Sequence, residues 1–293
     1  PSESAERPGG IIPAGLDMGA LPRPPAGYHP RPGKHPSHAR LVETFIGYLH
    51  DPSMSTDSVT TALAPTGTLR ATINVGNPIL AGLDAATGAP RGVSVDIARE
   101  LAQRLAIPLE CVVVDAAKKS VETVASGRAD IGFFAVDPVR GADIAFTEPY
   151  VLIEGCYLVR QDSPLRDNSS VDAPNTRVAA GAGSAYDLFL TRELKRATIV
   201  RVPTSPAVVA AFIEQGLEVA AGVKQQLQAD ASRHRGLRLI EEPFMVIRQA
   251  MGVARARGDG AARYLRAFVD DLRASGFVRE ALARHGIEGA TPG

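Results

Sequence analysis

From Gly67 onward, strand-like runs of β-branched and apolar residues alternate with helical patterns, and this alternation limits the chain to few folds. A first round of predicted strands and helices occupies, in order, 68–75, 97–105, 107–114, 120–126 and 129–135. A second round occupies 176–180, 185–197, 198–202, 206–215 and 217–223. Because parallel strands need a right-handed crossover, each round predicts a doubly wound α/β unit. Such sheets bind ligands at the carboxyl ends of their strands.

The elements after the second round are expected to return to the first unit. Residues 244–255 lead to predicted helices over 261–274 and 276–285, and the second unit already has its own strands and helices. We therefore predict an α/β protein with two doubly wound lobes joined by a two-crossing hinge. Lobe 1 is assigned to 66–151 and 247–293, and lobe 2 to 152–246.

The first 53 residues differ in composition, and residues 1–65 are predicted to be a disordered or extraneous N-terminal tail. Nine of the 22 prolines lie between Pro1 and Pro36, and four of the six histidines lie between His29 and His50. Such a composition disfavours packing. A short helical pattern over 39–50 stops at a proline. Metal binding by the histidines is the alternative to a solvated tail, and the tail is favoured.

Charge and motif content exclude several classes of function. The 32 basic and 32 acidic side chains cancel, so no overall field attracts nucleic acid. No glycine-rich nucleotide-binding motif follows a predicted strand, and no apolar run is long enough for a membrane span. Cys111 and Cys156 fit no metal or redox motif, and two buried free thiols are favoured over a disulfide. We expect no metal, no cofactor and no nucleic-acid partner.

Several short strings, in this order and spacing, resemble those of bacterial family 3 solute-binding proteins, the ligand-capturing subunits of ABC importers. They are 92–102 (GVSVDIARELA), 127–131 (GRADI), 137–140 (DPVR), 144–150 (IAFTEPY), 183–184 (GS) and 275–277 (SGF). The resemblance implies a periplasmic binding protein type II fold that closes on a small carboxylate ligand, an amino acid or a related organic acid. It also implies an ABC importer membrane subunit as partner, a monomer, and a periplasmic or extracytoplasmic location. No signal peptide is visible, so a cytoplasmic location stays an alternative.

The resemblance indicates the ligand-binding residues. Arg140 follows a strand end, where a guanidinium can offer two parallel donors to a carboxylate; the alternative is an ion pair with Asp137 or Asp143. Gly183 and Ser184 precede a helix, so their free N–H groups and hydroxyl suit an anion, although Ser184 also suits a helix cap. Asn77 is either a polar contact or a turn residue.

Two positions depart from the family's amino-acid binders. Asp137 stands where they usually have a threonine, so it either takes a ligand ammonium group or turns away and steadies Arg140. Lys224 stands where they commonly have an aspartate for the ammonium group. Lys224 either favours a second carboxylate or a polar oxygen, which indicates a dicarboxylate, a keto acid or an amino acid bound differently, or it points to solvent.

An enzyme on the same fold is the main alternative function, because cyclohexadienyl dehydratase resembles these binding proteins. Glu154 and Lys224 would then serve as acid and base. No nucleophile–histidine arrangement is apparent, and Glu154 is favoured as a hinge hydrogen-bond acceptor. We therefore predict a binding protein without catalytic residues. A sensory ligand-binding domain has the same expected structure.

Overall fold

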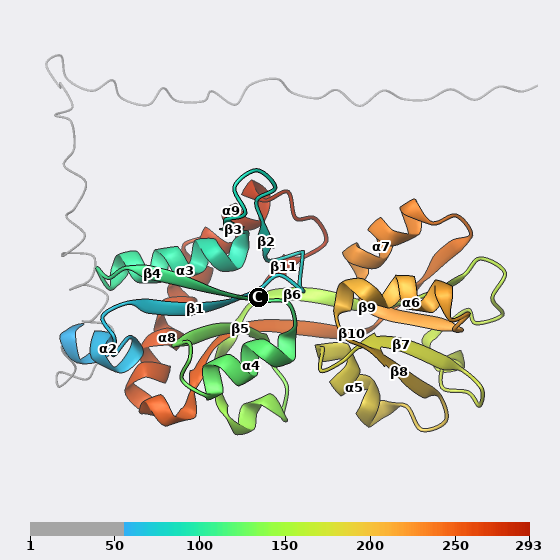
Figure 1. Cartoon of the computed structure of the whole chain (residues 1–293), viewed down its shortest axis with the longest axis horizontal. Helices are drawn as coiled ribbons and strands as arrows, with labels where there is room; N and C mark the ends of the chain where they lie inside the picture. The colour runs from blue at the N-terminus through green and yellow to red at the C-terminus, as the bar shows by residue number, and fades with distance from the viewer. Residues whose placement is uncertain (1–55) are drawn as a thin grey trace, which may run out of the picture.

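The computed structural model describes residues 56–293, which form two lobes joined by long central strands (Figure 1). All the long strands belong to one curved sheet with the order β4-β1-β5-β10-β6-β9-β7-β8. We call the part with β1, β4 and β5 the first lobe and the part with β7, β8 and β9 the second lobe. A separate pair of short strands, β2 (Gly82–Leu83) and β3 (Pro90–Arg91), projects from the first lobe.

The first lobe contains the predicted parallel unit. Strand β1 (Leu69–Asn74) lies between β4 (Leu109–Val114) and β5 (Ile131–Ala135), and both pairings are parallel. Helices α3 (Val93–Arg104) and α4 (Ala117–Ala125) are the crossovers. Helices α8 (Gly258–Ala274) and α9 (Phe277–Arg284) come from the end of the chain and complete this lobe. The predicted doubly wound arrangement is confirmed.

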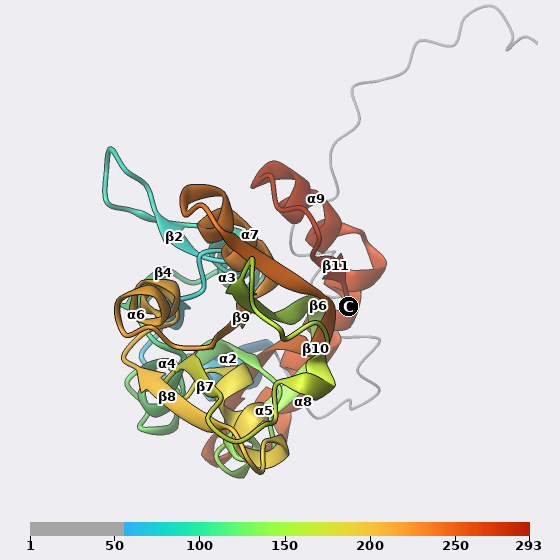
Figure 2. The ribbon, with the colours of Figure 1, turned by 90° about the vertical axis from the view of Figure 1, so that its right-hand side faces the viewer.

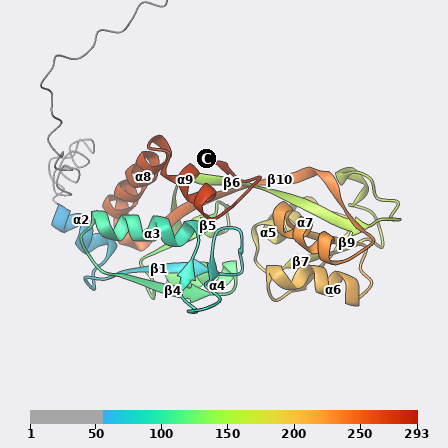
Figure 3. The ribbon, with the colours of Figure 1, turned by 90° about the horizontal axis from the view of Figure 1, so that it is seen from above.

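The second lobe repeats this arrangement (Figure 3). Strand β7 (Arg177–Gly181) lies between β8 (Thr198–Val202) and β9 (Val219–Val223), again in parallel. Helix α5 (Ala185–Glu193) packs on one face of these strands, and α6 (Val208–Glu214) and α7 (Lys224–Arg233) pack on the other (Figure 2). The alternation along β7 explains this, because Val178 and Ala180 face α5 while Ala179 faces α6.

Two long antiparallel strands connect the lobes. Strand β6 (Ile144–Arg160) and strand β10 (Leu237–Ala254) pair with each other; β10 also pairs with β5, and β6 with β9. A short strand β11 (Thr291–Pro292) lies along β6. The predicted lobe boundaries, 151/152 and 246/247, fall inside these continuous strands and stay a prediction.

The folded region begins earlier than predicted. Helix α2 (Thr56–Leu63) packs against α8, and both Val59 and Leu63 are fully buried. Their i, i+4 spacing places them on the same face of the helix, which gives α2 an apolar side to bury. The assignment of 56–65 to a tail was therefore wrong. The predicted helical pattern at 39–50 and the histidine-rich segment lie outside the described residues.

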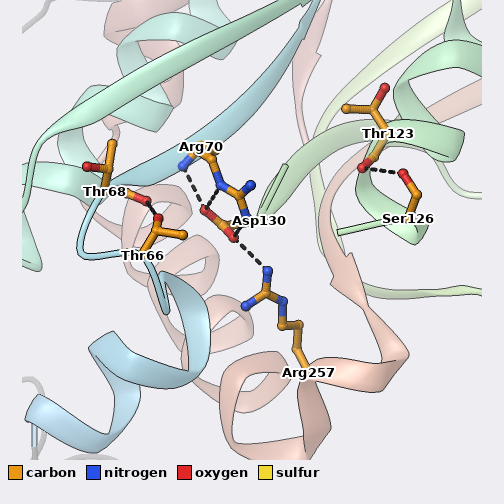
Figure 4. A network of polar contacts seen from close by, with 7 residues as sticks. All are labelled: Thr66, Thr68, Arg70, Thr123, Ser126, Asp130 and Arg257. Carbon is orange, nitrogen blue, oxygen red and sulfur yellow. Dashed lines mark hydrogen bonds and ion pairs between the residues drawn. The ribbon is translucent and has the colours of Figure 1, made fainter. Parts of the chain in front are cut away.

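Each lobe is braced by an arginine–carboxylate pair at the amino-terminal end of its central strand. In the first lobe, the buried Asp130 carboxylate accepts hydrogen bonds from Arg70 and Arg257, each at 2.7 Å to Oδ1 (Figure 4). In the second lobe, Arg177 binds Glu218 through the same backbone N–H, Nε and Nη2 donors that Arg70 uses. These networks lie away from the carboxyl ends of the strands and serve the fold.

Within residues 56–293 both thiols are free, with Cys156 buried and Cys111 only partly buried. None of the helices described here combines the length and apolarity that a membrane span needs. The described part of the chain also holds no cluster of histidine, cysteine and carboxylate side chains that suits a metal ion.

Candidate functional site

A small cavity lies where the two lobes meet, at the carboxyl ends of β1, β5 and β7. Its volume is about 60 Å³ in this conformation. Both lobes and both central strands contribute to its wall. The polar and aromatic lining residues are Asn74, Asn77, Ser94, Phe133, Phe134, Arg140, Tyr150, Ser184, Tyr186, Ser205, Gln226 and Gln249. Of the residues predicted to bind ligand, the fold thus brings together Arg140, Ser184 and Asn77.

Arg140 is the one charged side chain among the described residues that line this cavity. It follows β5 in a short 3-10 helix, Arg140–Ala142, and is 5% exposed. Its Nη1 donates to the carbonyl of Ala135 (3.0 Å) and its Nη2 to the carbonyl of Gly183 (2.8 Å). Burial lowers its pKa to about 10, so the guanidinium stays charged at neutral pH. The alternative that the sequence left open for Arg140, a surface ion pair with Asp137 or Asp143, is not formed.

Asp137 faces away from the cavity. Its carboxylate accepts hydrogen bonds from the Val139 N–H (2.9 Å) and pairs with Arg192 Nη1 of helix α5 (3.0 Å). Asp137 belongs to the first lobe and Arg192 to the second, so this pair joins the two lobes. Of the two alternatives for Asp137, the structure has the side chain turned away, and its charge supports the protonated form of Arg140 through space.

Ser184 and Gly183 stand at the start of α5, as predicted, but they do different things. Ser184 is the N-cap: its Oγ accepts the N–H of Asp187 (3.1 Å), and the residue also lines the cavity. The N–H of Gly183 donates to Asp187 Oδ2 (2.8 Å), and its carbonyl accepts from Arg140. Both backbone groups of Gly183 are therefore occupied. Gly183 does not offer its N–H to a ligand as predicted, because the Asp187 carboxylate already occupies this helix start as the anion.

A left-handed conformation is required at Gly183, where φ is +68°. A Cβ atom here would also lie 3.0 Å from the Cβ of Lys118, which belongs to the first lobe. Glycine thus allows the lobes to approach each other at this turn.

Lys224 and Glu154, the pair considered as catalytic acid and base, bind each other outside the cavity lining. Lys224 Nζ lies 2.6 Å from Glu154 Oε2, and this hydrogen bond raises the pKa of Lys224. Glu154 lies in β6, so it is an acceptor in a strand that joins the lobes, as predicted. Lys224 presents no free cation to the cavity and does not point freely to solvent.

Several neutral polar residues of the cavity were not predicted from the sequence. Ser94 and Ser205 stand at or near helix starts, and Gln226 lies in the first turn of α7. Gln249 is 8% exposed in β10, where a glutamine within an apolar strand was the available signal. Asn77 was predicted, and its Oδ1 is buried without a hydrogen-bond partner among the described residues.

Two aromatic residues, Phe133 and Tyr150, belong both to the hydrophobic core and to the cavity wall. Phe133 and Tyr150 are buried and pack edge to face with ring centroids 5.9 Å apart, yet they also form part of the cavity wall. Helix α3 begins at Val93 with Gly92 as its N-cap, so Asp96 lies inside the helix and does not cap it. Asp96 instead pairs with Arg284 and His285 of α9.

The profile of the bacterial extracellular solute-binding proteins, family 3, matches residues 77–286. Because this match spans well over half of the chain, the chain belongs to that family. The predicted family is therefore confirmed, together with the two-lobed α/β fold of periplasmic binding proteins. A comparison with curated protein sequences finds no match.

Solved structures share the fold at low identity. An amino acid ABC transporter substrate-binding protein from Streptococcus pneumoniae, bound to L-arginine, is 16% identical with a TM-score of 0.66, over 80% of this chain and 99% of that one. A mutant of ArgBP from T. maritima is 17% identical with a TM-score of 0.65, over 79% and 98%. The ancestral amino acid-binding protein AncCDT-1, a precursor of cyclohexadienyl dehydratase, is 16% identical with a TM-score of 0.65, over 78% and 97%.

Proposed function

We propose that this protein captures a small carboxylate-bearing solute between its lobes and delivers it to an ABC-type importer. Arg140 is the anion-binding residue, and Ser184 and Asn77 are further ligand contacts. Similar solved structures, such as the amino acid ABC transporter substrate-binding protein from Streptococcus pneumoniae, support the importer as partner. An extracytoplasmic location and a monomeric state belong to the same proposal.

The buried, unneutralised charge of Arg140 carries this proposal. Among the described residues, no carboxylate lies within ion-pair distance of the guanidinium, although its side chain is almost fully buried. A buried cation is costly unless an anion pairs with it. A ligand carboxylate would supply that anion with two parallel, charge-assisted hydrogen bonds. The site therefore suits an anionic ligand better than a neutral one.

Binding without catalysis is the function that this geometry supports best. Glu154 and Lys224 neutralise each other, and the cavity wall holds no other charged group than Arg140 among the described residues. A proton-transfer step needs an acid or base within hydrogen-bond reach of the ligand. The geometry therefore favours a binding protein over a dehydratase.

Replacing Arg140 tests the proposal. We expect Arg140→Met to abolish carboxylate binding, measured by titration calorimetry and by the ligand-induced rise in melting temperature. The exposed Arg235→Met variant is the matched control and should bind as the wild type does. Circular dichroism and the melting curve of the ligand-free protein establish that both variants are folded. Near-native affinity in Arg140→Met would refute the anion site.

A further inference from the structure

The cavity has a charge of one sign only. Its described wall consists of the Arg140 cation and neutral side chains, with no aspartate or glutamate. Burial raises the pKa of Tyr150 and Tyr186, so both phenols stay neutral at physiological pH. One ligand carboxylate therefore neutralises the whole site.

Three carboxylates in or next to the segments that form the cavity wall are engaged in ion pairs. Asp137 pairs with Arg192 (3.0 Å). Asp187 pairs with Arg201 (2.9 Å) and accepts the N–H of Gly183. Glu154 pairs with Lys224. A ligand ammonium group in this cavity would be buried without a counter-charge, and burying an unpaired charge is strongly unfavourable.

A second ligand carboxylate also lacks a partner. Lys224 is the cation that we expected to receive it, but its ammonium group lies 2.6 Å from Glu154 and outside the cavity lining. Because Arg140 already pairs with the first carboxylate, a dicarboxylate would place an unpaired anion among neutral side chains. The expectation of a dicarboxylate ligand is therefore disfavoured.

The neutral part of the wall suits an uncharged polar group. Asn77 Oδ1 is a buried acceptor without a hydrogen-bond partner in the described part of the chain, and Gln226 and Gln249 add amide groups on the sides formed by α7 and β10. A ligand hydroxyl can donate to such an acceptor, and a ligand carbonyl can accept from amide or hydroxyl donors.

We infer that the ligand is a monocarboxylate whose polar substituent is an uncharged hydroxyl or carbonyl group and not an ammonium group. The inference rests on the proposed function, because it assumes that Arg140 binds the carboxylate. It narrows the ligand class to hydroxy and keto acids and separates this chain from binders of free amino acids.

Matched pairs of ligands test the inference on the wild-type protein. Each pair exchanges only an ammonium group for a hydroxyl: serine with glycerate, leucine with 2-hydroxyisocaproate, and phenylalanine with phenyllactate. Succinate represents the dicarboxylates. In titration calorimetry, we expect at least one hydroxy acid to bind about tenfold or more tightly than its amino partner and more tightly than succinate.

A designed carboxylate should weaken this preference. Gln226→Glu places an acid in the cavity wall, and we expect the ratio of hydroxy-acid to amino-acid affinity to fall about fivefold or more. Gln228→Glu makes the same change at an exposed position of the same helix and should leave the ratio unchanged. If Gln226→Glu does not fold, the wild-type comparison decides alone.

The outcomes separate the inference from the proposed function. An amino acid or succinate that binds more tightly than the hydroxy acids, and loses binding in Arg140→Met, would overturn the inference and leave the carboxylate site standing. Absence of binding by every carboxylate tested would overturn both. Preference for a hydroxy acid that depends on Arg140 supports both.

Discussion

Arg140 is buried, and its charge is not neutralised by a neighbouring carboxylate among residues 56–293. A bound anionic ligand should therefore change the titration of Arg140. Burial lowers the pKa of Arg140 to about 10, which leaves the guanidinium charged at neutral pH. A bound carboxylate favours the charged form, so the complex holds this proton more tightly than the free protein does.

The sign of the pH dependence follows. Because only the charged guanidinium pairs with a carboxylate, affinity should be constant between about pH 6 and about pH 9 and should fall as the pH rises through about 10. Calorimetric titrations across this range, with circular dichroism at each pH, measure it. Affinity that changes steadily between about pH 6 and about pH 9 would implicate another titrating group.

Individual site residues could be predicted where they follow the carboxyl end of a predicted strand. Arg140, Ser184 and Asn77 follow predicted strands, and the fold brings all three to the cavity. The ion pairs of Asp137 with Arg192 and of Lys224 with Glu154 were not predicted, because the partners lie far apart in sequence and meet only after folding.

At the scale of elements, α2 is a short amphipathic helix that a prediction based on composition missed. Its apolar residues Val59 and Leu63 are fully buried, although the preceding proline-rich sequence drew the predicted start of the fold to about Thr66. The helix packs on α8, which comes from the far end of the chain.

A substitution in α2 tests whether this helix stabilises the first lobe. We expect Leu63→Ala to lower the free energy of unfolding by about 3 kcal/mol, because it removes a buried side chain and leaves a cavity. Thr61→Ala changes an exposed residue of the same helix and should alter stability by less than about 0.5 kcal/mol. Urea denaturation measures both, and equal effects of the two variants would contradict the packing role of α2.

The long strands β6 and β10 are the elements that sequence patterns described least well. The parallel strands were predicted because turns and helices bound them. In β6, by contrast, the burial is nearly continuous across the junction of the lobes, so no change of pattern marks where one lobe ends.

At the scale of the whole molecule, contacts between the lobes hold the structure in a closed arrangement. Asp137 pairs with Arg192, Arg140 donates to the Gly183 carbonyl, and Gln225 donates to the Glu288 carbonyl (3.0 Å). A ligand that binds the closed form benefits from each of these contacts.

Removing one contact should shift the balance toward the open form. We expect Arg192→Ala, which leaves the Asp137 carboxylate without its partner in the closed form, to weaken ligand affinity about fivefold. Small-angle scattering should show a larger radius of gyration for the ligand-free variant. Arg196→Ala, at an exposed position nearby, is the control. Unchanged affinity and scattering for Arg192→Ala would mean that this pair does not contribute to closure.

The central position of β10 also sets an order of events during folding. All strands and helices of the second lobe except β10 lie within one continuous stretch of chain, so they can assemble from neighbouring segments. The sheet of the first lobe is completed later, because β5 (Ile131–Ala135) pairs with β10 residues that are synthesised more than a hundred positions later. Closing so long a loop is slow relative to local contacts. A nascent chain that has emerged only as far as β9 therefore holds the strands of both parallel units but leaves one edge of β5 unpaired. Because an unpaired strand edge promotes aggregation, a holding chaperone is expected to bind there.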